Sequence, residues 1–350
     1  MRKNKVENTR KGTFMRKSII KLNSSILGAA SVVGEKEHEG PIGHLFDLHD
    51  KDDTFGQKTW ERAESEMQRL AVNMLLKKQN MREDEVDAMF AGDLINQCTS
   101  SAYGLLEFTI PYFGLYGACS TAAEGLMLAS VMTSCRVYDR CVSVTSSHNC
   151  SAERQFRTPL EYGAQRPPTA QWTVTGAGAF LVCPCGSAES EGKARVVEAL
   201  PGISVEKGIR DANNMGAAMA PAALDTLVRY FSESGSSPED FDLVVTGDLG
   251  YEGNSILGEL LRSEGIDLGT RLNDCGMIIF SRETQDTHAG GSGCGCSAVV
   301  LASYLLPKLE SGEIHDMLIL GTGALMSPDS VKQGLGIPGI AHLLHIKGAR

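Results

Sequence analysis

The sequence predicts an α/β protein built from two copies of one layered unit, and two internal repeats carry this prediction. Residues 84–94 and 239–249 align without a gap at an offset of 155, and both run through an apolar segment to Gly-Asp-Leu. A second pair, Cys119-Ser120 and Cys296-Ser297, aligns at an offset of 177. The offset grows by 22 residues, which indicates an insertion in the second copy. Repeats so far apart indicate two α/β halves and not a solenoid of short units.

The first copy shows the expected order of strands and helices. Residues 18–33 form an apolar strand region, and residues 60–78 carry apolar side chains at the three- and four-residue spacing of a helix. The strand of the first repeat ends at Gly92, and a further helix begins at Cys119. Residues 146–172 are expected to be irregular, and residues 174–182 form a strand that begins at a glycine-rich corner.

The second copy repeats this order. A helix is expected at about residues 220–231, with Pro221 in its first turn, followed by the strand of the second repeat. Residues 317–326 predict a buried strand, and residues 186–193 form a polar joint between the copies. The predicted organisation is a tail over residues 1–18, a first half over 19–185 and a second half over 194–350.

Composition restricts the function. At 350 residues and 42% hydrophobic, the chain can bury a large core, and no uncharged apolar run approaches the ~20 residues that cross a bilayer. The net charge of −10 argues against a nucleic-acid partner. Ten cysteines without a disulfide-like framework or a signal peptide favour reduced thiols and a cytoplasmic location.

The first 17 residues differ from the rest because they hold seven Lys and Arg residues against a single Glu7. Two interpretations stay open. The segment is a disordered, solvated tail, or the working protein begins at Met15. Alternatively, it is an electrostatic arm for anionic lipid, worth about 1 kcal/mol per basic residue near a charged membrane.

The most specific local signal is Tyr116-Gly117-Ala118-Cys119-Ser120, which opens a helix without proline. A cysteine in a first helical turn experiences free N–H groups and the positive end of the dipole, which favour thiolate. The alternative is a small apolar residue at a crowded helix start. The pair Cys294 and Cys296 lacks the second pair that a zinc site requires, so no metal site is expected.

The two-copy layout, the Gly-Ala-Cys-Ser helix start and the Gly176-Ala177-Gly178-Ala179 corner resemble the thiolase superfamily, which includes ketoacyl synthases. The resemblance covers about residues 19–350. It implies a thiolase-like fold of two tandem βαβαβαββ halves, related by a pseudo-twofold axis and packed in five layers (αβαβα). It also implies a nucleophilic cysteine on a buried helix and a homodimer paired through the first half.

One branch of that superfamily is much more similar. Residues 92–97, 113–120, 288–297 and 321–328, together with Asp47 and residues 50–56, resemble the stage V sporulation protein AD family of spore-forming bacteria. That family is associated with uptake of dipicolinic acid, largely as its calcium chelate, into the developing spore.

Carried over by position, the resemblance assigns Cys119 to the nucleophile and His288 to the catalytic histidine of the second half. The third catalytic position, a histidine or asparagine in condensing enzymes, falls at Asp248. A neutral donor there would stabilise an oxyanion, whereas an ionised carboxylate repels developing negative charge. Asp248 would also oppose thiolate formation at a neighbouring Cys119.

The resemblance therefore favours a binding protein for dipicolinic acid, a planar dianion suited to a helix start. The expected ligand-binding residues are Cys119, Ser120, Asp93, Asp248, His288 and Ser292. Calcium would enter only with the ligand, and capping after a strand is an equal alternative for Asp93 and Asp248. The expected partners are membrane-embedded proteins of the same uptake system, with peripheral association at the inner forespore membrane. The alternative function is an acyltransferase with Cys119 as acyl acceptor and His288 as base.

Overall fold

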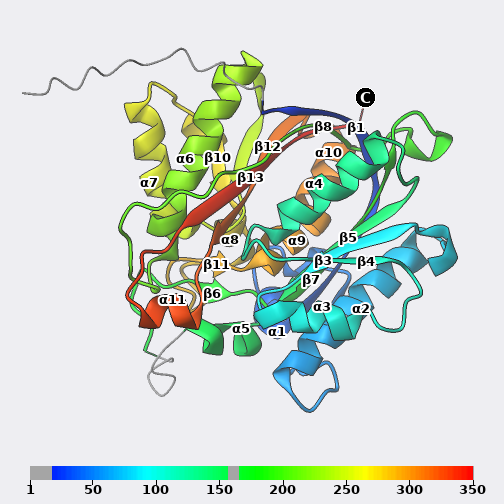
Figure 1. The fold of residues 1–350 in the computed structure, drawn as a ribbon, viewed down its shortest axis with the longest axis horizontal. Helices are drawn as coiled ribbons and strands as arrows, with labels where there is room; N and C mark the ends of the chain where they lie inside the picture. Colours follow the sequence, from blue (N-terminus) through cyan, green and yellow to red (C-terminus); the bar gives the residue numbers. More distant parts are fainter. Residues whose placement is uncertain (1–17, 157–164, 350) are drawn as a thin grey trace, which may run out of the picture.

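The computed structural model describes residues 18–156 and 165–349, so the basic segment and its two interpretations lie outside the described residues. The described part of the chain forms an 11-stranded sheet, a two-stranded ribbon and the helices that cover them (Figure 1). The two copies inferred from the repeats are both present in this sheet.

The first half supplies β1 (Ile20–Gly34), α1 (Glu35–His38), β2 (Leu48–Asp50), α2 (Trp60–Lys78), β3 (Ala88–Gly92), α3 (Thr99–Gly104), β4 (Tyr112–Leu115), α4 (Thr121–Ser134), β5 (Cys141–Ser147), α5 (Asn149–Phe156), β6 (Trp172–Thr173) and β7 (Gly176–Pro184).

The second half supplies β8 (Arg195–Leu200), α6 (Met215–Ser234), β9 (Leu243–Thr246), α7 (Gly250–Ser263), β10 (Leu272–Asp274), α8 (Cys275–Ile279), β11 (Gly291–Ser292), α9 (Cys294–Val300), α10 (Leu306–Glu310), β12 (Asp316–Ala324), α11 (Pro328–Lys332) and β13 (Gly339–Lys347).

Strand order shows that the two halves are copies of one unit. The first runs β1-β7-β5-β3-β4 and the second β8-β13-β12-β9-β10, so each places its first, fifth, fourth, second and third long strands in the same sequence. The directions also match, because two antiparallel pairings are followed by two parallel ones in each half. Asp93 and Asp248 each follow the second strand of their half and therefore occupy equivalent places.

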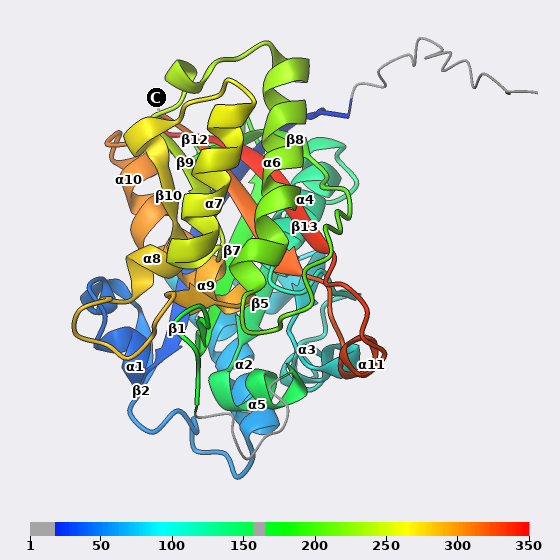
Figure 2. The same ribbon diagram turned by 90° about the vertical axis from the view of Figure 1, so that its left-hand side faces the viewer.

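The helices divide the molecule into five layers. Helix α2 packs on the outer face of the first half-sheet, and α4 and α9 lie between the two half-sheets (Figure 1). Helices α6 and α7 cover the outer face of the second half-sheet, where the turned view shows them side by side (Figure 2). Three buried apolar clusters fill the spaces between these layers.

Two helix predictions had different outcomes. Helix α2 begins and ends where its apolar spacing predicted, and the Thr59 side chain caps its first turn by accepting from Arg62 N–H. Helix α6 begins at Met215, five residues earlier than expected, because Asn214 caps it. Pro221 consequently lies inside the helix and not in its first turn, which corrects the prediction.

The segment 146–172 was expected to be irregular, and its described part is more ordered than that. Asn149–Phe156 form α5, and Trp172–Thr173 pair with Gly291–Ser292 in the ribbon β6–β11. This ribbon joins the two halves beside the central layer, because its strands come from opposite copies.

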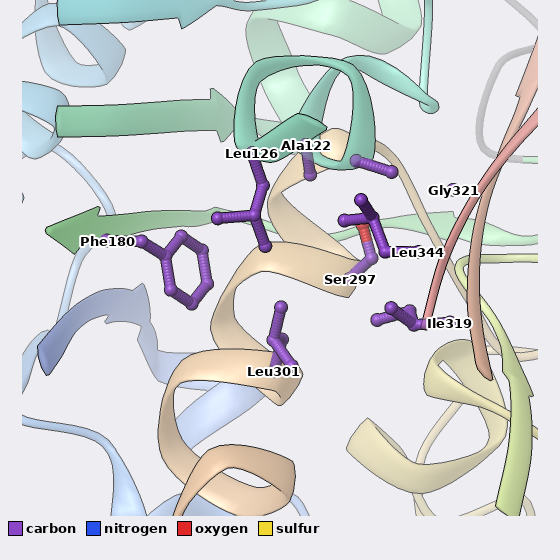
Figure 3. Close-up of a pocket in the computed structure, with 9 residues that line it drawn as sticks. Ala122, Leu126, Phe180, Ser297, Leu301, Ile319, Gly321 and Leu344 are labelled. Atoms are coloured by element: carbon purple, nitrogen blue, oxygen red, sulfur yellow. The ribbon is translucent and has the colours of Figure 1, made fainter. Parts of the chain in front are cut away.

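The central layer is tightly filled. A cavity of roughly 10 Å³ remains between α4 and α9, where Leu126, Phe180 and Leu301 converge (Figure 3). A space of this size holds at most one water molecule, and an apolar lining leaves such a space dry. The described residues therefore leave no acyl-chain tunnel at this place along α4.

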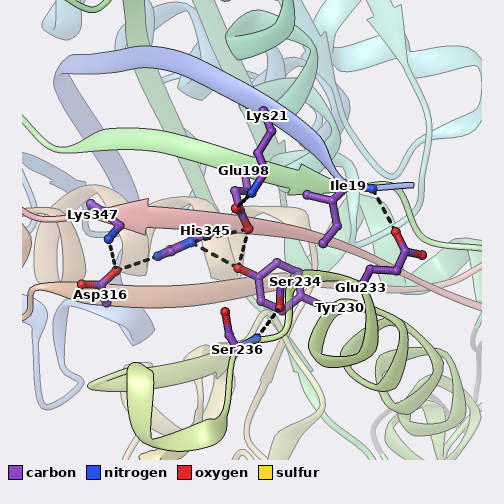
Figure 4. Close-up of polar contacts among 10 residues, drawn as sticks. All are labelled: Ile19, Lys21, Glu198, Tyr230, Glu233, Ser234, Ser236, Asp316, His345 and Lys347. Carbon is purple, nitrogen blue, oxygen red and sulfur yellow. Dashed lines mark hydrogen bonds and ion pairs between the residues drawn. The ribbon is translucent and has the colours of Figure 1, made fainter. Parts of the chain in front are cut away.

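A cluster of polar side chains connects helix α6 with three strands of the second half-sheet (Figure 4). Tyr230 donates a hydrogen bond to Glu198 at 2.7 Å and lies 3.2 Å from His345 Nδ1, and His345 Nε2 lies 2.8 Å from Asp316. These contacts link α6 to β8, β12 and β13 through side chains alone.

Candidate functional site

Cys119 lies in the turn between β4 and α4, where the two half-sheets meet the central layer. Its side chain is buried, and the preceding Ala118 has a left-handed φ of 51°. The Ser120 and Thr121 N–H groups donate to Gly117 and Ala118 carbonyl oxygens at 3.1 and 3.2 Å. These two N–H groups are therefore already engaged, which reduces the number of free donors expected at this helix start.

Asp248 is buried beside Cys119, and both oxygens of its carboxylate already accept hydrogen bonds. One oxygen accepts from Thr322 Oγ1 at 2.7 Å, and the other accepts from Gly293 N–H at 2.9 Å and from Ser292 Oγ at 3.2 Å. The Cys119 Sγ lies 3.9 Å from Ser292 Oγ, the same hydroxyl that donates to Asp248. Cys119, Asp248 and Ser292 are thus brought together, as the resemblance implied.

The electrostatics of this group favour the thiol. Burial raises the pKa of Cys119 well above its usual value, and the neighbouring Asp248 charge raises it further. Burial likewise raises the pKa of Asp248. Desolvation and a nearby carboxylate therefore oppose the thiolate that a helix dipole of about 0.3–1 kcal/mol favours, in the direction expected for Asp248 beside Cys119.

His288 does not join this group. Its Nδ1 lies 2.9 Å from the Pro167 carbonyl oxygen, and its Nε2 lies 3.0 Å from Asp286. Within the described residues its polar contacts are these two, and none reaches Cys119. The left-handed φ of 49° at His288 belongs to the loop that turns the ring in this direction. The expected pairing of His288 with Cys119 is therefore absent from this arrangement.

Asp93 holds a loop in place. One carboxylate oxygen accepts from Ile95 N–H at 2.9 Å, and the other accepts from the N–H and hydroxyl of Ser101 at 2.8 and 2.6 Å. The side chain is fully buried behind these contacts. Of the two alternatives, the contacts favour capping over ligand binding at Asp93. The Ser120 hydroxyl is also engaged within its own turn, because it donates a hydrogen bond to the Gly117 carbonyl oxygen at 2.6 Å.

A buried carboxyl that the sequence analysis missed lies next to this loop. Glu64 accepts from Ser146 Oγ at 2.9 Å and from Ser151 Oγ at 2.6 Å, and burial raises its pKa to about 8. Gln68, one turn further along α2, donates from Nε2 to Gly92 O, Ser101 Oγ and Ser146 Oγ. Two polar residues four apart on the apolar face of the predicted helix were the available signal.

A pocket of about 40 Å³ opens beside Cys119. Its walls come from the loop after β3, the start of α4, the end of α5, the start of α6 and the segment after β12. They consist of Leu94, Asn96, Tyr116, Ala118, Cys119, Gln155, Phe156, Met215, Ala324, Met326, Ser327 and Pro328. Of the predicted ligand-binding residues, Cys119 lines this pocket and the other five do not. Asn96 lies within the segment 92–97 that carries the family resemblance but was not singled out there, and no sequence signal marked Gln155.

Backbone strain gathers at the same place. Gln97 and Cys98 are consecutive left-handed residues in the loop after β3, and Ala118 is a third beside Cys119. Non-glycine residues in this conformation cost about 1 kcal/mol or more each and persist where the surrounding structure holds them. Their position beside the pocket supports a functional role for this region.

Two further features bear on binding. Within residues 18–156 and 165–349, no group of three or more His, Cys, Asp or Glu side chains is arranged to hold a metal ion. Over the same ranges, no helix has the length and apolar character needed to cross a membrane.

Comparison with known proteins agrees with this fold. Solved structures that resemble the chain include a variant of OleA from Xanthomonas campestris, with a TM-score of 0.57, 15% identity, and coverage of 93% of this chain and 98% of the other. They also include 3-oxoacyl-[acyl-carrier-protein] synthase III from Aquifex aeolicus, with a TM-score of 0.55, 13% identity, and coverage of 93% and 99%. At these identities the likeness establishes the thiolase-like fold alone.

Sequence relatives are more specific. The family described as Stage V sporulation protein AD matches residues 15–347. Stage V sporulation protein AD of Bacillus subtilis (strain 168) is 41% identical over 314 residues, which cover 90% of this chain and 91% of that protein. The chain therefore belongs to the stage V sporulation protein AD family, and it is a sporulation protein with a thiolase-like fold.

Proposed function

We propose that this protein binds dipicolinate, as its calcium chelate, in the pocket beside Cys119 and supports its uptake into the developing spore. The observation that carries the proposal is the buried Cys119 thiol, which lies 3.9 Å from Ser292 Oγ, the hydroxyl that donates to the Asp248 carboxylate. This arrangement suits a pocket wall and disfavours a nucleophile.

Acyl transfer would need a different arrangement. The sulfur must attack as thiolate, and the carbonyl oxygen must acquire negative charge next to hydrogen-bond donors. Here the group beside the sulfur is an acceptor whose oxygens already bind Thr322, Ser292 and Gly293. His288, the expected base, is engaged by Pro167 and Asp286. Among the described residues, the acyltransferase alternative therefore finds His288 directed away from Cys119 and an acceptor, Asp248, beside the sulfur.

The charges around the pocket support the chelate over the free dianion. The described residues that line the pocket include no Lys, Arg or His, and the buried Asp248 acts on the neighbouring Cys119. A dianion would enter without a cationic partner, which makes its desolvation unfavourable. One calcium ion bound to the two carboxylates cancels the ligand's charge, and calcium is well suited to oxygen ligands.

Ligand entry requires the pocket to widen, because ligand sites commonly measure about 300–1,000 Å³. The segment that carries α11 is the part of the wall best suited to move, since none of the residues of α11 is buried. Its base is held by a hydrogen bond from Leu325 N–H to the Pro338 carbonyl oxygen. We place the chain as a peripheral protein at the inner forespore membrane, where membrane-embedded proteins of the same uptake system receive the ligand.

The test combines binding and covalent chemistry on the full-length protein. Isothermal titration with dipicolinate, with and without calcium, should show binding that calcium strengthens. Mass spectrometry after incubation with acyl-CoA should show no adduct on Cys119. An acyl adduct on Cys119 together with no dipicolinate binding would overturn the proposal in favour of acyl transfer.

A further inference from the structure

A second hollow, larger than the Cys119 pocket, lies on the outer surface of the first half. It is a groove of about 550 Å³ between the N-terminal part of α2 and helix α3, two helices that lie side by side in Figure 1. Its floor is the place where these helices approach most closely, because a side chain added at Gly104 would come within 2.4 Å of the Ser65 carbonyl oxygen. This packing fixes the two walls relative to each other, so the groove is already formed in the single chain.

The charges in the groove leave one cation without a partner. Both carboxylates in its walls are taken by arginines. Glu66 accepts from Arg69 Nε at 2.8 Å, and Glu61 is paired with Arg154 of helix α5. Arg62 also lines the groove, is exposed, and has no ion pair among the described residues. On a protein with a net charge of −10, this is a local site of positive charge with which an acidic group can pair.

Exposed apolar surface continues outward from the groove. Tyr103 lines the groove and is 69% exposed, and Leu106, three residues further along the chain, is 72% exposed. The Tyr103 hydroxyl has no hydrogen-bond partner among the described residues. Tyrosine and arginine are the residue types, with tryptophan, that contribute most often to the binding energy of protein interfaces. An unpaired Arg62 beside an exposed Tyr103 is therefore typical of a protein-binding surface.

We propose that the α2–α3 groove binds an acidic segment of a protein partner, with a carboxylate of that segment on Arg62 and an apolar side chain against Tyr103 and Leu106. The inference rests on the proposed function and deepens it, because it assigns the surface by which a membrane-embedded protein of the uptake system holds this chain. A lipid surface fits the groove less well. Binding to anionic headgroups takes a cluster of several basic residues, whereas the unpaired cation here is a single arginine on an acidic protein.

The position of the groove suits a partner that receives the ligand. The groove and the Cys119 pocket share the loop after β3, because Asn96 lines the pocket and Thr99 lines the groove. Between these two residues the chain passes through the left-handed pair Gln97 and Cys98. A partner bound in the groove therefore lies against the loop that forms one wall of the pocket.

The experiment measures binding of the full-length protein to inner forespore membranes stripped of their peripheral proteins, with vesicles of the extracted lipids for comparison. Arg62→Glu should weaken binding to the membranes by roughly tenfold or more, because it removes an ion pair and brings like charges together. Lys77→Glu is the matched control, since it makes the same change of charge at an exposed position of α2 outside the groove, and it should leave binding unchanged. The lipid vesicles should bind far less protein and should not distinguish the two variants.

Photo-cross-linking then identifies the occupant. With Tyr103 replaced by a benzophenone amino acid, the cross-link should join a membrane polypeptide at a segment that contains Asp or Glu, as mass spectrometry would show. Changing those acidic residues to Lys should restore binding by Arg62→Glu, a rescue that a folding defect in the variant would not permit. Arg62→Glu should bind dipicolinate as wild type does.

Three results would overturn this inference. They are no membrane binding by wild type, equal membrane binding by wild type and Arg62→Glu, and a cross-link to lipid, to a second copy of this chain or to a segment without carboxylates. Normal dipicolinate binding by wild type in any of these cases would leave the proposed ligand binding standing, whereas its absence would overturn that proposal separately.

Discussion

Glu64 provides the sharpest test of the buried polar network behind the pocket. Its carboxyl group is fully buried, and its pKa is raised from 4.5 to about 8 by burial and then by the nearby Asp93 charge. The folded protein therefore holds a proton at Glu64 that the unfolded chain releases at lower pH. We expect stability to fall as pH rises from about 4.5 to 8, with no further loss from this group above pH 8.

The magnitude follows from the pKa. Since each pKa unit is worth about 1.4 kcal/mol, moving the pKa from 4.5 to about 8 limits the effect of Glu64 to roughly 5 kcal/mol. Glu64→Gln removes the titrating carboxyl group. It also places an amide N–H opposite one of the two serine hydroxyls that donate to Glu64, and this lost hydrogen bond lowers the stability by about 1 kcal/mol. The variant should therefore be more stable than wild type by roughly 2–4 kcal/mol at pH 8.5, and within about 1 kcal/mol of it at pH 5.

The assay is urea unfolding of both proteins at several pH values from 5 to 9. Ser151→Ala serves as a linked control, because it removes a hydroxyl that donates to Glu64 at 2.6 Å and lowers the pKa of that carboxyl. In Ser151→Ala, the loss of stability with rising pH should continue to a higher pH than in wild type. In the double variant with Glu64→Gln, this pH-dependent loss should disappear. Parallel stability curves for wild type and Glu64→Gln would refute the reasoning.

Four further predictions concern the site, the polar cluster, assembly and the tail. Dipicolinate should slow alkylation of Cys119, and Cys119→Ala should bind it better than Cys119→Trp; equal binding by both variants would place the ligand elsewhere. The pKa of Glu198 is lowered to about 2, first by the neighbouring His345, whose Nδ1 lies 3.8 Å away. The stabilisation from Glu198 should therefore be lost as pH falls from 4.5 towards 2 and be absent in Glu198→Gln, as acid unfolding would show. The expected homodimer would pair along the open edge of β4, where Phe113 is 40% exposed; Phe113→Glu should give a monomer mass by light scattering, and a monomeric wild type would contradict the dimer. Deleting residues 1–10 should weaken vesicle binding modestly and only at low salt, whereas complete loss would show that the arm is the main anchor.

The fold could be predicted because its evidence is local and doubled. Gly-Asp-Leu after two apolar strands and Cys-Ser at two helix starts fixed the positions of equivalent elements in both halves. Helix α2 was predictable for the same reason, since its apolar spacing depends on nearby residues alone. Helix α5 was missed because Asn149–Phe156 has few apolar residues, and its contacts with α2, β6 and α11 could not be read from the local sequence.

The site was harder to predict because its chemistry depends on residues far apart in the chain. The helix dipole at Cys119 is a local property, whereas the Asp248 carboxyl that opposes it arrives from the other half. The direction of the His288 ring depends on a carbonyl oxygen 121 residues away, at Pro167. Asn96 and Gln155 of the first half share one pocket with Met215 and Met326 of the second half, so its walls are complete only after both halves have folded.

The insertion in the second copy explains why two equivalent aspartates have different roles. In the first half the residues that follow Asp93 fold back onto it, so its carboxylate is consumed within its own loop. In the second half the longer connection leads through β11, which pairs with β6 of the first half, and brings Ser292 and Gly293 onto Asp248. The same connection holds Asp248 against a thiol of the opposite copy. An acceptor fixed in this way cannot stabilise a developing oxyanion, but it can keep Cys119 protonated and the pocket uncharged, which is what a site for a charge-neutral chelate requires.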